Sequence, residues 1–224
     1  MPQFRRVAPN VLKYDVLAQL RSAIVEGQFE PGEHLIEAEI ANQIGVSRGP
    51  VREAIQSLEL EGLVVNIPNK GTFVATFSVK DVRELTSLRG LLEALAIKLA
   101  LPNITELDIA QLEYLVDQMR EAGREGDVKK LVQYDWDFHE LIFQKADHTR
   151  LYRVLHGLNL QIRYFIHVTD LLFSSLDNVA DTHLPILEAI RRKDPMEAET
   201  SIVRHITEVG EELETQLSRK EAIS

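Results

Sequence analysis

The segment at residues 40–63, IANQIGVSRGPVREAIQSLELEGL, constrains the fold of this chain more than any other part of it. Gly45 allows the positive φ that a tight turn between two helices requires. Ser47 is a favoured N-cap residue, so Arg48 and Arg52 lie one turn apart near the start of the second helix. These features predict a helix-turn-helix whose second helix contacts bases and phosphates in the major groove of DNA. The alternative from these residues is a pair of amphipathic helices packed in a larger bundle.

A short hairpin is predicted directly after these helices. Residues 63–66 and 72–75 are β-prone, and the turn between them, IPNKG, contains proline, asparagine and glycine. Lys70 at the tip can reach a phosphate, and Gly71 allows the backbone to approach a groove closely. Because residues 11–27 form a further amphipathic helix upstream, the first part of the chain is predicted to be a winged helix-turn-helix.

The composition limits the class of protein. The chain has no cysteine, no apolar run long enough to span a bilayer, and no apolar segment after its first arginines, so we expect a cytoplasmic protein without disulfides. The net charge of −10 is unusual for a DNA-binding protein, but binding depends on local cations. So few cations on one face predict that two copies bind DNA together; the residues that can gather there are Arg5, Arg6, Arg48, Arg52 and Lys70.

The chain is predicted to divide near residue 76, into a DNA-binding domain at residues 1–76 and an all-helical domain at residues 77–224. After this boundary the pattern is helical to the end, with no β-rich run. We therefore expect a mostly α protein: an N-terminal winged helix-turn-helix followed by an all-α antiparallel helical-bundle effector domain. Six helices are predicted in the second domain, at residues 79–101, 105–122, 128–146, 150–173, 176–192 and 195–218.

Four side chains in the helical part could form a metal site. Asp135 and His139 leave the same face of a helix, since they are four residues apart. His183 and His205 lie on the last two predicted helices. One carboxylate and three imidazoles suit Zn²⁺, Ni²⁺ or Mn²⁺, with one or two positions left for water or a ligand. From spacing alone, a helix-surface ion pair and unrelated packing histidines are the more common arrangement.

The first part of the chain resembles the amino-terminal domain of GntR-family bacterial transcription regulators. The resemblance is carried by the elements PGE.L, A...GVSR.PVREA, L..EGL and GTFV, which have the spacing of that family. At Ala38 the chain departs from relatives that carry arginine, so one contact with DNA is absent and the operator can differ. The residues that the resemblance implies face DNA are Ser47, Arg48, Gly49, Pro50 and Arg52, with Lys70 and Gly71 in the minor groove.

The helical part resembles the FCD effector domain of the FadR branch of that family, in the pieces LRGLLEALAIKLA, FHELIFQKA and THLPILEAIRRKDPMEAETSIVRHI. The metal ligands of metal-binding members match Asp135, His139, His183 and His205. The resemblance therefore implies a divalent transition metal, foremost zinc, at these four residues. Asp137 is two residues from His139, so it points away from the shared face. Six helices, rather than seven, imply the shorter VanR-like subgroup.

The resemblance also implies an effector beside the metal, which in this family is often a small carboxylate or hydroxy acid. Arg89 matches a position that often pairs with such anions, and its planar fork suits a carboxylate. The alternative for Arg89 is a surface ion pair with Glu93. Arg163 is a second candidate for the effector. Other nearby side chains are predicted to be surface or packing residues: His34, His148, His156, His167, Tyr134, Trp136 and Phe138.

The predicted function is that of a homodimeric repressor, not an enzyme. It binds a palindromic operator in double-stranded DNA and releases it when a small organic acid binds the helical domain. Activation in place of repression is equally compatible with the residues. One alternative is a regulator for which the metal ion itself is the signal. Another is a metalloenzyme whose metal activates water, but no further side chain stands out as a general base and the winged helix would have no role.

Overall fold

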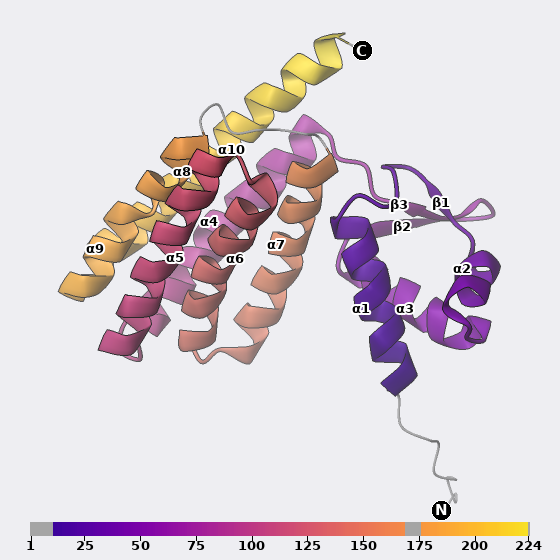
Figure 1. Cartoon of the computed structure of the whole chain (residues 1–224), viewed down its shortest axis with the longest axis horizontal. Helices are drawn as coiled ribbons and strands as arrows, with labels where there is room; N and C mark the ends of the chain where they lie inside the picture. Colours follow the sequence, from indigo (N-terminus) through magenta and orange to yellow (C-terminus); the bar gives the residue numbers. More distant parts are fainter. Residues whose placement is uncertain (1–10, 169–175, 224) are drawn as a thin grey trace, which may run out of the picture. The chain divides into compact units, whose positions relative to one another are not determined.

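The computed structural model describes residues 11–168 and 176–223 (Figure 1). The chain divides into two compact units, Met1–Thr76 and Phe77–Ser224. Arg5, Arg6 and the end of the predicted helix at 150–173 lie outside the described residues. Within the described part, no helix is long and apolar enough to cross a membrane.

The first unit packs helices beside a small antiparallel sheet with the strand order β1-β3-β2. The first helix buries the face that carries its apolar residues at helical spacing, including Val16, Leu20 and Ile24. The arrangement confirms the predicted winged helix-turn-helix. The elements are α1 (Val11–Val25), β1 (His34–Leu35), α2 (Glu37–Ile44), α3 (Arg48–Leu60), β2 (Val64–Ile67) and β3 (Gly71–Val74).

The turn between α2 and α3 has the conformation that its residue types predict. Gly45 has a φ of 79°, and its N–H donates to the carbonyl of Ala41. Ser47 is the N-cap of α3 in an extended conformation, but its side chain makes no capping hydrogen bond. Pro50 is tolerated in the first turn because the N–H groups there have no partner within the helix. The helix therefore begins at Arg48, at the position that the sequence indicates.

Strand β1 has no counterpart in the sequence prediction. It consists of two residues, which pair with β3 through His34 opposite Phe73 and Leu35 opposite Thr72. Two residues are too few to show an alternating pattern of polar and apolar side chains. The strand exists because β3 offers it a partner, and the local sequence alone does not reveal it.

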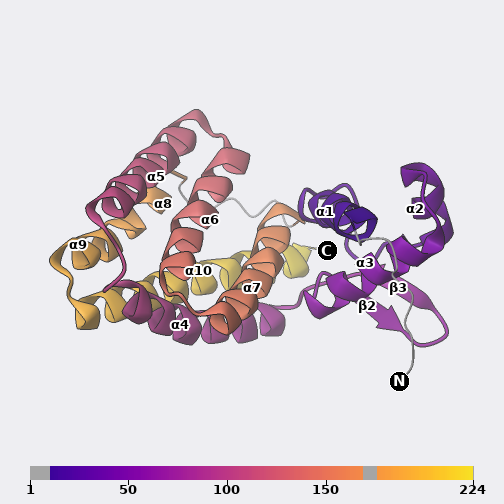
Figure 2. The same ribbon diagram turned by 90° about the horizontal axis from the view of Figure 1, so that it is seen from below.

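The second unit is a bundle of helices, as predicted, in which α4 and α10 lie side by side in both views (Figures 1 and 2). These two helices run antiparallel, since Arg83 pairs with Glu214 at one end and Lys98 pairs with Glu199 toward the other. The described residues of this unit form α4 (Val79–Ala100), α5 (Glu106–Glu125), α6 (Val128–Lys145), α7 (Thr149–Val168), α8 (Leu176–Thr182), α9 (Leu184–Arg192) and α10 (Pro195–Ile223).

Three features of these helices differ from the prediction. The predicted helix at 176–192 is two helices with a break at His183, so the described part of this unit has seven helices and the count no longer supports the six-helix subgroup. The second helix continues through Gly123 and ends at Gly126, whose φ of 73° allows a left-handed cap. The last helix continues beyond residue 218.

A level of buried polar residues separates two apolar cores in this unit. On α4, Val82 and Leu85 belong to one core, whereas Ala96 and Ile97 belong to the other. Buried polar groups in native proteins normally have hydrogen-bond partners, and those without partners need an explanation. A functional site in this unit is therefore expected at this level. The buried polar side chains at this level include Arg89 and Glu93 on α4, His139 on α6, Asn159 on α7, His183 before α9 and His205 on α10.

Candidate metal centre and nucleic-acid interface

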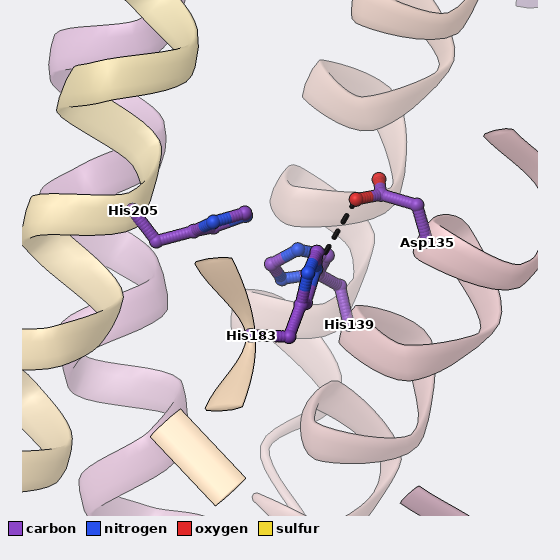
Figure 3. A group of neighbouring side chains, drawn as sticks. All are labelled: Asp135, His139, His183 and His205. Atoms are coloured by element: carbon purple, nitrogen blue, oxygen red, sulfur yellow. Dashed lines mark ion pairs between the residues drawn. The ribbon is translucent and has the colours of Figure 1, made fainter. Parts of the chain in front are cut away.

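Four side chains converge at this polar level (Figure 3). Asp135 and His139 come from α6, His183 from the junction of α8 and α9, and His205 from α10. One possible ligand atom from each residue lies within 4.8 Å of the other three. The three imidazoles are buried, whereas the side chain of Asp135 is 27% exposed. The structure thus brings together the four residues that the sequence singled out as a metal set.

A break in the helix positions His183. This residue has φ −86° and ψ −18° and is the N-cap of α9, where a proline, Pro185, occupies the first turn. Proline has no N–H and its ring clashes with the preceding turn of a helix, so one continuous helix cannot run through this point without distortion. This is the physical reason why the continuous helix predicted at 176–192 is wrong. The ring of His183 packs edge-on against Phe138, with 4.8 Å between the ring centroids.

Each imidazole of the cluster is held at its Nδ1 atom by an oxygen. The hydroxyl of Thr182 donates its hydrogen to the carbonyl of Val179, so its oxygen is free to accept. Each Nδ1 therefore carries the proton and each Nε2 keeps its lone pair. The three contacts are His139 Nδ1 to Glu93 Oε2 at 2.7 Å, His183 Nδ1 to the Val179 carbonyl at 2.9 Å, and His205 Nδ1 to Thr182 Oγ1 at 3.1 Å.

Two of the Nε2 atoms are placed so that they could bind a cation. The Nε2 atoms of His139 and His183 are buried and have no hydrogen-bond partner among the residues that the structure describes. Nε2 of His183 lies 3.2 Å from Oδ1 of Asp135, and a lone pair that faces a carboxylate is unfavourable unless a cation is nearby. Since unpartnered buried polar atoms are destabilising, the residues present fit a divalent transition metal.

The protonation states of the cluster also suit metal binding. Burial by itself raises the pKa of Asp135, but the three neighbouring imidazoles hold it well below its usual range, so the carboxylate is ionised. Burial, together with the neighbouring imidazoles, lowers the pKa of His205 well below its ordinary value, so this ring is neutral. An ionised carboxylate and a neutral imidazole are the forms that bind a metal.

Arg89 does not form the surface ion pair that was one interpretation of its position. Its guanidinium donates to Glu93, and both side chains are buried. Burial alone raises the pKa of Glu93, but Arg89 and His139 lower it below its ordinary value, so the carboxylate is charged. Glu93 therefore bridges Arg89 and the metal cluster, a role that the sequence reasoning missed. Its signal was a single acidic residue inside the apolar run LLEALAIKLA.

Arg163, the other candidate for the effector, lies on α7 against a neighbouring helix. Its guanidinium donates to Gln133 at 2.9 Å and lies 5.1 Å from the centroid of the Trp136 ring. Asp137 accepts a hydrogen bond from Gln133 at 2.8 Å and is not one of the four converging residues. Gln133 therefore links the side chains of Arg163 and Asp137 by hydrogen bonds.

Three of the remaining histidines occupy surface and packing positions. His34 is exposed and stacks on Phe73, and His148 accepts the N–H of Leu151 at the start of α7. His156 packs edge-on against Trp136, whereas the side chain of His167 lies outside the described residues. Of the three aromatic residues near the metal positions, Trp136 and Phe138 are buried and Tyr134 is partly buried against the larger core.

The amino-terminal end of α3 presents the residues expected to face DNA. Ser47, Arg48, Gly49 and Arg52 are exposed and Pro50 is partly buried. Glu37 on α2 holds the guanidinium of Arg52 at two points, with Nε 3.0 Å from Oε1 and Nη2 2.8 Å from Oε2. The hydrogen bond with Arg52 lowers the pKa of Glu37, so the pair is charged.

The wing ends in a turn with two residues of positive φ, Asn69 at 64° and Gly71 at 111°. Lys70 between them is exposed at the tip. A Cβ atom added to Gly71 would lie 2.4 Å from Nε2 of His34, so the positive φ favours glycine here and any larger residue would also displace the His34 ring. Gly71 therefore supports the packing of the wing in addition to any approach to DNA.

The family of this chain follows from its similarity to known proteins. Residues 12–74 match the family described as bacterial regulatory proteins, gntR family, and residues 84–208 match the FCD domain. The chain belongs to the GntR family. The HTH-type transcriptional repressor RspR of Escherichia coli (strain K12) is 31% identical over 197 residues, which cover 86% of this chain and 84% of RspR. The HTH-type transcriptional regulator YdhC of Bacillus subtilis (strain 168) is 28% identical, over 95% of this chain and 96% of YdhC.

A solved structure supports the fold of this GntR-family chain. E. coli McbR/YncC has a TM-score of 0.80 and 23% identity to it, and the match covers 94% of this chain and 99% of that one. The relatives of this chain are transcriptional regulators and not enzymes. The protein is therefore a transcriptional regulator with a winged helix-turn-helix and a helical FCD domain that contains the Asp-His cluster.

Proposed function

We propose that this GntR-family regulator is a repressor that binds a palindromic operator as a homodimer and carries a divalent metal, foremost zinc, as the anchor for a small organic acid. One observation carries the proposal: four donors converge in the helical domain, and two buried imidazole nitrogens among them have no partner in the described residues. Nitrogen and oxygen donors of this kind suit zinc, and an ion that expands beyond four ligands has a position for one more oxygen. When bound, the ion supplies a Lewis acid for a carboxylate oxygen of the effector.

DNA is recognised by α3 and the wing. In this proposal Ser47, Arg48, Gly49, Pro50 and Arg52 contact the major groove, while Lys70 and Gly71 enter the minor groove. Support comes from the exposure of Lys70 at the wing tip and of four residues around the start of α3, namely Ser47, Arg48, Gly49 and Arg52. A guanidinium fork suits both guanine and phosphate oxygens, and exposed arginines one turn apart can contact neighbouring positions on the duplex.

A second copy of the chain is the proposed partner of α4. Leu88, Leu91 and Leu95 are all exposed, and their spacing of three and four residues places them on one side of the helix. An apolar stripe of this kind is better covered by protein than by water. A two-fold dimer also places two recognition helices at the half-sites of a palindrome. Repression, in place of activation, is proposed because the relative RspR is named a repressor.

The effector is proposed to bind the open side of the metal, with Arg89 or Arg163 as a cationic partner. Arg89 lies close enough to the cluster to lower the pKa of His205 through its charge. The effector changes DNA affinity only if it binds one arrangement of the dimer more tightly than another. We propose that the acid favours the arrangement in which the recognition helices no longer match the half-sites.

The test combines metal analysis with a thermal-shift screen of small organic acids, sugar acids and amino acids. We expect bound metal at a fixed ratio to the chain, and at least one acid that raises the melting temperature because it binds only the folded state. Removal of the metal with a chelator should abolish that shift. If no acid acts on the metal-loaded protein, and if a zinc titration alone releases DNA sites selected in vitro, the regulator senses metal and not an acid.

A further inference from the structure

Helix α4 supplies none of the four ligands, yet one of its side chains is directly joined to them. Oε2 of Glu93 lies 2.7 Å from Nδ1 of His139, and Oε1 of the same carboxylate accepts from Arg89. All three side chains are buried. Burying these charges costs free energy, and removing one partner would be strongly destabilising. The pair therefore holds Glu93 firmly beside His139.

The chemistry of this bridge acts on the far side of the imidazole ring. A carboxylate can only accept, so it keeps the proton of His139 on Nδ1 and leaves Nε2 as an electron-pair donor. Hydrogen-bonded carboxylates of this kind fix the ring orientation of metal-binding histidines and raise their basicity. The positive charge of Arg89 allows Glu93 to remain ionised while buried.

We propose that Glu93 is the carboxylate that holds His139 in place for the metal, and that through it α4 responds to metal binding. This inference rests on the metal centre of the proposed function. The helix begins at Val79, and only two residues separate it from the end of the first unit at Thr76. In this proposal, a shift of His139 on metal binding displaces Glu93 and with it α4, the first helix after the DNA-binding unit in the sequence.

The first test measures the affinity of the full-length protein for Zn²⁺ by competition with a chromophoric chelator, and the visible spectrum of the Co²⁺-loaded protein. Glu93→Gln should weaken zinc binding about 10–100-fold and change the cobalt spectrum. The matched control is Glu84→Gln, which removes the same charge from an exposed position on the same helix and should behave as the wild type. Wild-type zinc affinity and an unchanged cobalt spectrum in a folded Glu93→Gln protein would overturn the inference.

A second variant covers the case in which Glu93→Gln does not fold, since it leaves Arg89 without its carboxylate. The double variant Arg89→Gln with Glu93→Gln removes both buried charges together. It should fold and still bind zinc weakly, because a neutral amide cannot replace the carboxylate behind His139. Recovery of wild-type zinc affinity in this double variant would show that Glu93 only balances Arg89, and the inference would be wrong.

Amide hydrogen exchange tests the response of α4 itself. Adding Zn²⁺ to the wild type should slow exchange around residues 89–93 as well as in α6 and α10, because ligand binding suppresses local opening. In Glu93→Gln, the slowing should remain in α6 and α10 and be lost in α4. Equal slowing of α4 in both proteins contradicts the inference. Failure of the wild type to bind any metal would instead remove the proposed metal centre on which it rests.

Discussion

Two arginine–glutamate pairs, one in each unit, have the same chemistry and opposite surroundings. In the first unit, the side chains of Arg52 and Glu37 are 61% and 30% exposed. In the second unit, those of Arg89 and Glu93 are 5% and 1% exposed. Ion pairs near water contribute little to stability and are easily exchanged, whereas a buried pair is strongly destabilising to break. The exposed Arg52–Glu37 pair can therefore exchange partners, whereas the buried Arg89–Glu93 pair is suited to keep its site in one arrangement.

This contrast gives each pair a different place in regulation. A DNA phosphate or base can replace Glu37 at the guanidinium of Arg52, because water already solvates much of both groups. Glu93 is buried and accepts from Arg89 on one oxygen and from His139 on the other, so it keeps its orientation toward His139. The exposed pair therefore presents an arginine that DNA can take over, and in the proposed role the buried pair transmits the state of the cluster to α4.

The largest expected effect comes from breaking the buried pair. Arg89→Met leaves the buried charge of Glu93 without its cationic partner, which should lower the free energy of unfolding of the helical unit by about 3–5 kcal/mol. Urea denaturation followed by circular dichroism measures this change. Lys98→Met on the same helix is the control, because its partner Glu199 is partly exposed. Equal effects of the two substitutions would mean that burial does not distinguish these pairs.

The next largest effect concerns the cluster that the buried pair supports. His183→Ala should weaken metal binding and remove the stabilisation that the ion gives, about 3 kcal/mol when the free metal is at a hundred times its dissociation constant. Thermal unfolding with metal and with chelator measures the difference. His148→Ala, at an exposed helix start, should keep the full metal effect. A metal-dependent shift of wild-type size in His183→Ala would exclude this ligand set.

A smaller effect is expected from the exposed pair, and on DNA rather than on stability. Arg52→Ala should weaken binding to an operator selected in vitro by about tenfold to a hundredfold, as does the loss of one base contact. Fluorescence anisotropy with labelled duplexes measures it, and Arg48→Ala provides a second test on the same helix. The melting temperature should be unchanged. Unaltered specific affinity in both variants would remove α3 from the proposed interface.

The smallest effect is the stability of the exposed pair itself. Glu37→Gln should change the melting temperature by less than about 2 °C. Because Arg52 lowers the pKa of Glu37 in the folded protein, the contribution of this carboxylate is present above its unfolded pKa of about 4.3. It is lost as the pH falls through the lower folded value. Thermal melts of both proteins between pH 3 and pH 7 should therefore converge in acid, and a growing difference in acid would reverse the sign of this argument.

Local sequence patterns predicted the features that depend on residues close to one another in the sequence. Gly45 and Ser47 mark the turn and the start of α3, and Asp135 and His139 share a face because of helix geometry alone. The convergence of all four cluster residues was predicted by resemblance and not by spacing. The wing turn followed from its asparagine and glycine.

Other features depend on tertiary contacts that no local pattern contains. Strand β1 is created by its pairing with β3. The break at His183 required weighing Pro185 against an otherwise helical pattern. The burial of Arg89 with Glu93 depends on the packing of α4 against other helices, so no local pattern distinguishes a buried pair from a surface pair.

The uneven exposure of the cluster has a kinetic consequence. Three of its four residues are buried imidazoles, and the partly exposed Asp135 is the one that reaches solvent. An ion must therefore enter and leave past this carboxylate, or wait for the helices to separate locally. In the proposed metal centre, slow exchange of this kind would preserve the ion acquired when the chain folds. A metal in the isolated protein would then reflect the supply in the cell at synthesis as much as the preference of the four ligands.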